Sequence, residues 1–177
     1  MADFALYILT ADDPAPKDER LARCARHYSG TPGSWETVRA PGGKPFFLHT
    51  PGLHFSVSHS GSFWVCAMGD APVGADVQEH RPCRSAALSR RFFHPDEDAY
   101  LSAGAYRDFF PVWCAKESFV KYTGEGIRRD FSSFSVVSGG VLTDRTEGAA
   151  LRRVALEAGY ELCLCAAEIG AVRVIHL

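Results

Sequence analysis

The chain has 177 residues, of which 46% are hydrophobic and 23% charged, a composition typical of one large globular domain or two small ones. Its net charge of -2 and the absence of a strongly basic segment argue against a nucleic-acid-binding protein. The first residues lack the pattern of a signal peptide, and no apolar run reaches the roughly 18 residues that span a membrane, so a cytoplasmic protein without a membrane anchor is expected.

Strand and helix patterns alternate along the chain and predict an α+β fold. Strands are predicted where β-branched and aromatic residues cluster, at 4–10, twice within 54–69, and at 73–78, 131–137, 160–168 and 172–177. Helices are predicted at 15–30, at 83–93, from 94 onward, and from 108–111 to Gly124. Residues 31–45 are expected to form a loop, because Thr, Pro, Gly and Ser dominate them.

The predicted helix over WCAKESFVKYTG, residues 113–124, has an unusual stripe. Helical spacing puts Trp113, Lys116, Glu117, Val120 and Lys121 on one side. An inward-facing stripe normally holds Leu, Ile and Ala, whereas this one places charges beside a large aromatic ring. The stripe therefore lies either at a boundary with solvent or along a functional site.

The predicted strand GADVQ carries two oxygen donors on one face. Asp76 and Gln78 alternate with apolar residues and project together, an arrangement that suits Mg²⁺ but also an ordinary half-exposed strand. Glu117 would join them if its helix crossed the strand. The alternative for Glu117 is a simple ion pair with Lys121 at i, i+4.

Two further segments carry residues suited to anions. In SVSHSG, the residues Ser58, His59 and Ser60 suggest a Ser–His hydrolase, yet no G-x-S-x-G motif surrounds them. His59 near a turn suits contact with an anion, or lies in solvent. Lys44 in GGKP can meet a phosphate as a point charge, or is simply solvated.

The order of these motifs resembles a known family. GGKP, FSVSHSG, VGADVQ, FF-x-x-x-E and W-x-x-K-E-S-x-x-K-x-x-G-x-G together resemble the 4′-phosphopantetheinyl transferases, most of all the type that activates peptide and polyketide synthetases. The resemblance runs from about Gly42 to Val137, over half of the chain, and WCAKESFVKYTGEGI is its most specific stretch.

The resemblance implies two similar α/β halves related by a pseudo-two-fold, with the active site in the cleft between them. The N-terminal half would span 1–70, and the C-terminal half, 71–177, would carry the metal site. The implied enzyme, expected as a monomer, transfers the 4′-phosphopantetheine arm of coenzyme A to a serine of an acyl or peptidyl carrier protein and releases 3′,5′-ADP. Such activity serves polyketide, nonribosomal peptide and fatty acid biosynthesis.

Residue roles follow from the same resemblance. Asp76, Gln78 and Glu117 would bind Mg²⁺, with Mn²⁺ as a substitute. Catalysis would rest on Asp76, on Glu117, which takes the proton of the carrier serine, and on Lys121, which stabilises the departing phosphate. The residues expected to bind coenzyme A are Lys44, Ser58, His59 and Lys121. Trp113 would pack the catalytic helix against the sheet.

Two departures from the family pattern affect these expectations. Gln78 stands where members often have an acid, which predicts weaker metal affinity. The N-terminal region is short, so Arg20, Arg23 and Arg26 are considered as substitutes for holding the 3′-phosphate. Candidate contacts for an acidic carrier are two arginine pairs, Arg90 with Arg91 and Arg128 with Arg129. The alternative function is a non-catalytic module that binds coenzyme A or a carrier.

Overall fold

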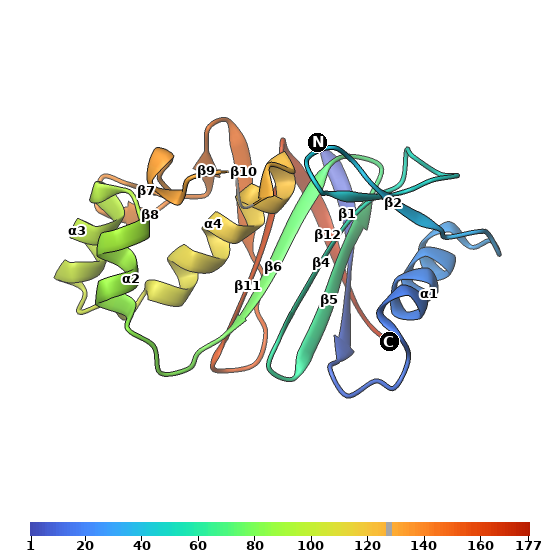
Figure 1. Ribbon diagram of the computed structural model, residues 1–177, viewed down its shortest axis with the longest axis horizontal. Coiled ribbons are helices and arrows are strands. Elements are labelled where there is room, and N and C mark those ends of the chain that lie inside the picture. Colours follow the sequence, from blue (N-terminus) through green and yellow to red (C-terminus); the bar gives the residue numbers. More distant parts are fainter. Residues whose placement is uncertain (127–128) are drawn as a thin grey trace.

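The computed structural model describes residues 1–126 and 129–177, and it stacks them as helix, sheet, sheet and helix (Figure 1). This arrangement confirms the predicted α+β class. A pseudo-two-fold relation between two halves and a division at residue 70 stay predictions. Within the described residues, no helix is both long and apolar enough to cross a membrane.

The first sheet joins the two ends of the chain. Its strand order is β12-β1-β5-β4, with bounds Ile169–His176 for β12, Ala2–Thr10 for β1, Phe63–Gly69 for β5 and His54–Ser60 for β4. The last strand pairs with the first in parallel, and the other pairs are antiparallel. The predicted hairpin over 54–69 is confirmed, and its turn contains Gly61 at a φ of 53°.

The second sheet carries the strand that was predicted to hold oxygen donors. Its order is β6-β11-β10-β9, with bounds Val73–Glu79 for β6, Tyr160–Ala166 for β11, Ala149–Arg153 for β10 and Arg145–Thr146 for β9. Two small ribbons accompany it, β2 (Thr37–Arg39) with β3 (Pro45–Phe47) and β7 (Val137–Ser138) with β8 (Val141–Leu142).

Two sequence predictions were wrong in part. Residues 31–45 are not all loop, because β2 and the start of β3 lie within them. The segment 131–137 is not a strand: Phe131–Ser133 forms a 3₁₀ turn, and strand β7 begins only at Val137. The Asp130 side chain accepts a hydrogen bond from the Ser132 N–H at 2.9 Å, which favours the turn over an extended strand.

The predicted helices are confirmed, with shifted ends. They are α1 (Lys17–Ser29), α2 (Ser85–Phe92), α3 (Pro95–Ala103) and α4 (Phe109–Thr123). Gly124 ends α4 in the left-handed conformation, at a φ of 76°, which glycine adopts without strain. Pro95 opens α3 in its first turn, where the missing N–H costs nothing.

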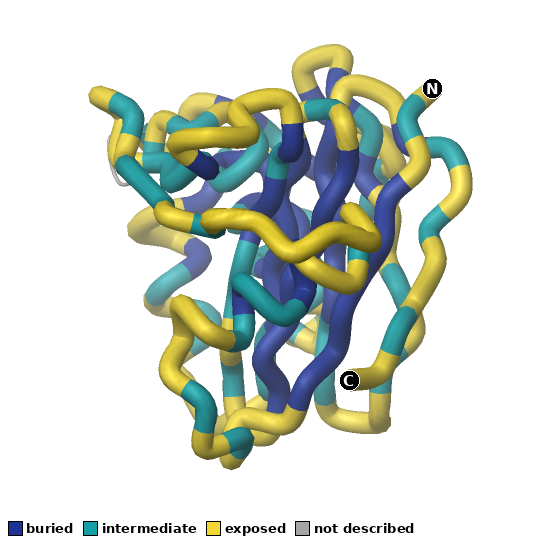
Figure 2. Tube along the Cα trace, turned by 90° about the vertical axis from the view of Figure 1, so that its right-hand side faces the viewer, coloured by how far each residue is buried: buried dark blue, intermediate teal, exposed yellow. Residues whose placement is uncertain are grey.

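Three apolar clusters hold the layers together, and Figure 2 shows the buried residues following the central strands. The middle cluster lies between the two sheets and includes Leu6 and Val65 from the first and Val77 and Leu164 from the second. One outer cluster packs α1 on the first sheet, and the other packs α4 on the second. Helix α4 is therefore fixed over the β6 strand by burial of apolar surface.

The two sheets meet along the edge strands β4 and β6, which lie side by side (Figure 1). Serine hydroxyls from β4 replace a backbone ladder there. Ser56 Oγ accepts from the Ala75 N–H at 2.9 Å, and Ser60 Oγ accepts from the Glu79 N–H at 3.0 Å. We call this junction the serine seam. It satisfies backbone donors that an edge strand would otherwise leave unpaired in the interior.

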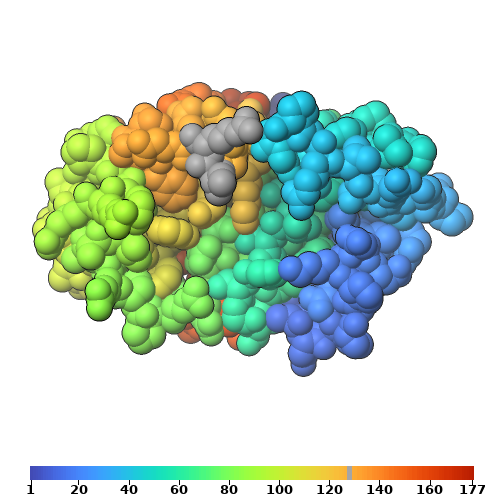
Figure 3. Space-filling model, in the orientation of Figure 1, coloured from blue at the N-terminus to red at the C-terminus, as the bar shows by residue number. Residues whose placement is uncertain are grey.

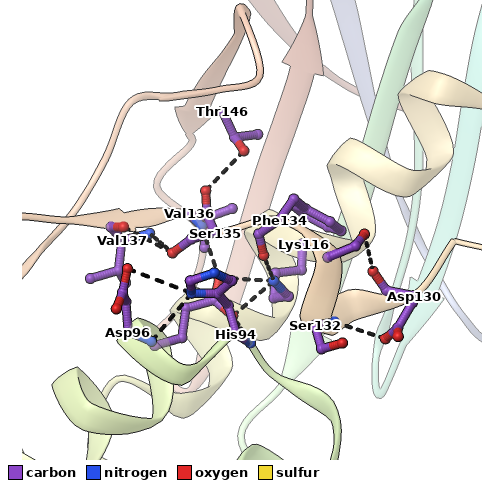
Figure 4. A network of polar contacts seen from close by, with 12 residues as sticks. His94, Asp96, Lys116, Asp130, Ser132, Phe134, Ser135, Val136, Val137 and Thr146 are labelled. Atoms are coloured by element: carbon purple, nitrogen blue, oxygen red, sulfur yellow. Dashed lines mark hydrogen bonds and ion pairs between the residues drawn. The ribbon is translucent and has the colours of Figure 1, made fainter.

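A buried ion pair fixes the other side of α4. Lys116 and Glu97 are both 0% exposed, and the Lys116 Nζ lies 2.8 Å from the Glu97 carboxylate. The same ammonium donates to the Phe134 carbonyl at 2.7 Å (Figure 4) and lies 3.9 Å from the centre of the Phe134 ring. Glu97 Oε1 also accepts from the Val136 N–H at 2.8 Å. Lys116 thus belongs to the interior and not to the charged stripe predicted for the site.

Removing one member of this pair should strongly destabilise the protein. Lys116→Met leaves a buried carboxylate without its counter-charge and should cost about 3–5 kcal/mol in urea unfolding. The double variant Lys116→Met with Glu97→Gln should lose less than Lys116→Met alone, because no lone charge remains buried. As a control, Arg26→Ala breaks an exposed pair with Glu19 and should cost at most about 1 kcal/mol. A loss from Lys116→Met no larger than that of the control would contradict this account.

Candidate functional site

The Asp76 carboxylate is the centre of the candidate site. It lies on β6 at the serine seam and is only 2% exposed. Its Oδ1 accepts hydrogen bonds from Lys121 Nζ at 2.6 Å and from Ser58 Oγ at 2.7 Å, and its Oδ2 accepts from Gln78 Nε2 at 2.8 Å. Groups from β4, β6 and α4 therefore converge on one buried charge.

Gly74 brings α4 close enough to reach Asp76. A Cβ at this position would overlap the Ser118 carbonyl and the Tyr122 backbone N, so only glycine allows the helix to lie directly on β6. One turn earlier in α4, Cys114 Sγ donates to the Asp76 carbonyl oxygen at 3.1 Å. The helix thus crosses the strand as the sequence analysis required for Glu117 to join Asp76.

Glu117 is a half-buried carboxylate near Asp76. Burial raises its pKa, and the negative charge of Asp76 raises it further, while Lys121 lowers it. The alternative ion pair between Glu117 and Lys121 is not formed among the described residues, because the Lys121 ammonium pairs with Asp76 instead. Two carboxylates close enough to repel each other, beside one ammonium, make a site for added positive charge.

Lys121 lies where three hollows of the surface meet. One, of about 660 Å³, is mainly apolar and contains Glu117, Trp113 and Phe92. The second, of about 410 Å³, extends toward α1, and the third, of about 380 Å³, extends toward Lys44. Figure 3 shows this face hollowed between the N-terminal part, in blue, and helices α2 and α3, in light green. A long ligand can therefore pass Lys121 and occupy more than one hollow.

The hollow toward α1 is lined by basic groups, two of which the sequence analysis missed. Lys17, Arg39, His59 and Lys121 line it together with one acid, Asp18, and Lys17 Nζ lies 3.4 Å from His59 Nε2. Lys17 is the first residue of α1, so the N-terminal end of that helix adds positive potential. Lys17 and Arg39 sit in ordinary polar segments, and only the tertiary fold brings them beside His59.

The three arginines considered for the 3′-phosphate make contacts within the protein instead. Arg20 donates to the carbonyl oxygens of Ala11, Asp13 and Ala15, and Arg23 pairs with the Asp13 carboxylate. Arg26 pairs with Glu19 at 2.6 Å on the exposed side of α1. None of the three lines the basic hollow, so the suggestion that they hold a ligand phosphate loses its geometric basis.

Lys44 is more enclosed than a solvated loop lysine. Its Nζ donates to the Val73 carbonyl at 2.9 Å and to the Tyr122 carbonyl near the end of α4 at 3.1 Å. It lines the third hollow together with Lys121. Burial lowers the pKa of Lys44 to about 8, so its charge is sensitive to mildly alkaline pH. Its predicted contact with coenzyme A stays a prediction.

The oxygen donors at the centre suit a magnesium ion. Asp76 and Glu117 supply carboxylates, and the repulsion between the two acids is what a divalent cation relieves. The Gln78 amide points its NH2 group at Asp76 Oδ2, so it would offer its oxygen to a cation only after the amide turns over. In residues 1–126 and 129–177, no cluster of three His, Cys, Asp or Glu side chains forms a metal site. With two acids and an amide, the predicted ligand set would not produce such a cluster.

The two arginine pairs differ in their surroundings. Arg90 and Arg91 are exposed at the end of α2, and the Arg91 guanidinium lies 5.1 Å from the centre of the Phe92 ring. Arg129 pairs with the Glu147 carboxylate at 2.6 Å, which occupies it within the protein. Arg128 lies outside the described residues. Arg90 and Arg91 are thus more available than Arg129 for contact with an acidic partner.

The lowered pKa of Lys44 predicts a pH-dependent stability. The unfolded chain holds this proton up to about pH 10.5 and the folded chain only up to about pH 8, so the unfolded state binds more protons between these values. The stability of the wild type relative to Lys44→Met should therefore rise by about 1–3 kcal/mol from pH 8 to 10.5. Urea unfolding of both proteins across this range measures it, and a flat difference would contradict the assigned burial of the charge.

Comparison with known proteins adds independent information. The family model of the 4′-phosphopantetheinyl transferase superfamily matches residues 72–165. The chain is 35% identical over 145 residues to 4′-phosphopantetheinyl transferase psf-1 of Bacillus pumilus, covering 76% of this chain and 62% of that protein. It is 33% identical over 136 residues to 4′-phosphopantetheinyl transferase Sfp of Bacillus subtilis, covering 71% of this chain and 60% of that protein.

The matched segment contains the part of the candidate site that lies on β6 and α4, whereas Ser58 on β4 precedes it. Asp76, Gln78, Glu117 and Lys121 all lie within residues 72–165, which make up more than half of the chain. The chain spans about 60% of the length of the curated relatives that it matches. From the extent of the match to the family model we conclude that this chain belongs to the 4′-phosphopantetheinyl transferase superfamily.

Proposed function

We propose that the protein transfers the 4′-phosphopantetheine arm of coenzyme A to a serine of an acyl or peptidyl carrier protein, in a magnesium-dependent reaction that releases 3′,5′-ADP. The observation that carries the proposal is the convergence of Asp76 with Lys121 and Ser58, next to Glu117, at the meeting point of three hollows. The family membership of the chain supports the same reaction.

In the proposed reaction, the carrier serine oxygen forms a bond to the phosphorus that carries the pantetheine arm. The bond from that phosphorus to the bridging oxygen breaks, and 3′,5′-ADP leaves. Glu117 accepts the serine proton, a role that its position on α4 beside Asp76 and Lys121 allows. The Lys121 ammonium, 2.6 Å from Asp76, is positioned to stabilise the charge on the departing phosphate.

Magnesium would be held by Asp76, Glu117 and Gln78, and when bound it supplies Lewis-acid stabilisation of the pyrophosphate. The chain's own contribution is to keep these oxygens together on β6 and α4. Ser58 supports this arrangement by donating to Asp76 from across the serine seam. Phosphoryl transfer depends chiefly on alignment and charge neutralisation, which this rigid setting supplies.

Coenzyme A would lie along the hollows that meet at Lys121. Its negatively charged nucleotide end suits the hollow lined by Lys17, Arg39 and His59, and its uncharged pantetheine arm suits the one lined by Trp113 and Phe92. In this proposal residues 1–70 supply most of the nucleotide contacts and residues 71–177 the metal site, with Lys44 and Ser58 reaching over from the first part.

The carrier protein would approach from the α2 side of the cleft. Arg81, Arg84, Arg90 and Arg91 give residues 81–91 four positive charges and no acid, and Phe92 opens onto the hollow of Glu117. Such a surface suits a partner with acidic residues around its serine. We propose that the protein acts as a monomer in the cytoplasm, on a carrier that this surface recognises.

The second candidate is a module that binds coenzyme A or a carrier without transfer. Its specific support is Gln78, which removes one negative charge from the proposed ligand set. The two candidates are separated by incubating the protein with apo-carrier, coenzyme A and Mg²⁺ and weighing the carrier by mass spectrometry. A mass gain of one phosphopantetheine group supports transfer, and binding without a mass gain supports the module.

Transfer should depend on both acids. Asp76→Asn and Glu117→Gln remove the two carboxylates and should each lower the initial rate in the carrier assay on the order of 100-fold or more. Asp144→Asn, a similar change in the β8–β9 connection, should leave the rate within about twofold, as surface changes away from a site usually do. Transfer that persists in Asp76→Asn or under chelation would contradict the magnesium site. Ester hydrolysis that survives chelation but disappears in Ser58→Ala or Ser60→Ala would instead favour a Ser–His hydrolase.

Restoring an acid at position 78 should tighten metal binding. Gln78→Glu adds a carboxylate beside Asp76 and should lower the Mg²⁺ concentration for half-maximal transfer by roughly tenfold, a typical effect for groups that support a metal ligand. The measurement is an Mg²⁺ titration of the transfer rate at saturating coenzyme A. An unchanged half-maximal concentration would show that charge at position 78 does not set the affinity.

A further inference from the structure

Glu161 lies beside Gln78 on the neighbouring strand. In the antiparallel pair of β6 and β11, Gln78 is directly opposite Glu161, and Asp76 is directly opposite Cys163. Directly opposed residues point to the same face of a sheet, with Cβ atoms about 4.5–5.5 Å apart. The Glu161 side chain therefore leaves β11 next to the proposed metal ligands.

The neighbours of Glu161 on β11 identify that face as the one under α4. Cys163 and Cys165 pack into the cluster below α4, whereas Leu162 and Leu164 pack between the two sheets. By alternation, Glu161 shares the face of Cys163. The buried Cys114 thiol of α4, which donates to the Asp76 carbonyl oxygen at 3.1 Å, lies over this same face.

Glu161 is anchored in the structure and still reachable. Its Oε1 lies 3.2 Å from His80 Nε2, and the His80 ring stacks on Phe110 of α4 with centroids 4.9 Å apart. The Glu161 side chain is 23% exposed, so it borders the site without being sealed in the core. His80 is thus a side chain that orients this carboxylate.

We infer that Glu161 supplies, from β11, the negative charge that the cation site lacks because β6 carries Gln78. The inference rests on the proposed function. Asp76 and Glu117 give two negative charges, Lys121 offsets one of them, and Gln78 adds none. Glu161 adds a third acid on the strand directly beside the neutral amide, and within residues 1–126 and 129–177 it stays outside any cluster of three acids that could bind a metal by itself. It is a positioning residue for the cation and takes no part in the bond changes.

The test measures metal binding without turnover. Mn²⁺ affinity is determined by electron paramagnetic resonance of the free ion, with coenzyme A present and no carrier. Glu161→Gln should weaken binding about tenfold, and the double variant Gln78→Glu with Glu161→Gln should bind like the wild type. Glu157→Gln removes an exposed acid just before β11 and should change nothing. Binding by Glu161→Gln within twofold of the wild type would overturn the inference.

Further variants separate this inference from the proposed function and from a loss of folding. Glu161→Asp keeps the charge and should bind Mn²⁺ within about threefold of the wild type, because the loss of about tenfold is expected only when a supporting group is removed. A loss as large as that of Glu161→Gln would contradict the argument from charge. If Asp76→Asn abolishes binding while Glu161→Gln does not weaken it, only this inference fails. If Asp76→Asn also binds normally, the proposed metal site fails as well.

Discussion

The serine seam is the constraint on which the rest of the structure depends. Two sheets meet at β4 and β6 without a backbone ladder, and Ser56 and Ser60 satisfy the β6 N–H groups instead. Between them, Ser58 donates to Asp76, so a hydroxyl of one sheet supports a buried carboxylate of the other. Because a buried charge is costly unless it is paired and hydrogen-bonded, Asp76 is stable only while both sheets and α4 keep their relative positions.

Helix α4 holds two lysines with opposite roles. Lys116 is completely buried against Glu97 and the Phe134 carbonyl, and it fixes the helix to the segment after it. Lys121, one turn later, pairs with Asp76 but remains 30% exposed. The fully buried Lys116–Glu97 pair holds the helix in place, and the partly exposed Lys121–Asp76 pair faces the hollows. A ligand can therefore compete for Lys121 without disturbing the packing that positions it.

Local sequence patterns predicted much of the candidate site, because the strand and helix periods decide which side chains share a face. Alternation in GADVQ put Asp76 and Gln78 on one face, and helical spacing put Glu117 near Lys121, because these periods depend only on backbone geometry.

Strand β10 was not predicted, because AALRR lacks β-branched residues and forms a strand only through pairing with its neighbours. The aromatic residues of 131–134 resembled a strand, but their rings surround Lys116. Lys17, Arg39 and Glu161 reach the site only through tertiary contacts, which no local pattern encodes.

The central claim is that Asp76 and Glu117 share one cation beside Lys121. The most direct test is a crystal structure of the protein with Mn²⁺ and coenzyme A, in which anomalous scattering locates the ion. We expect a single peak bonded to oxygens of Asp76 and Glu117, with the Lys121 ammonium turned toward the phosphates. An ion bound away from either carboxylate, or a Lys121 that still pairs with Asp76 while the pyrophosphate lies elsewhere, would contradict it.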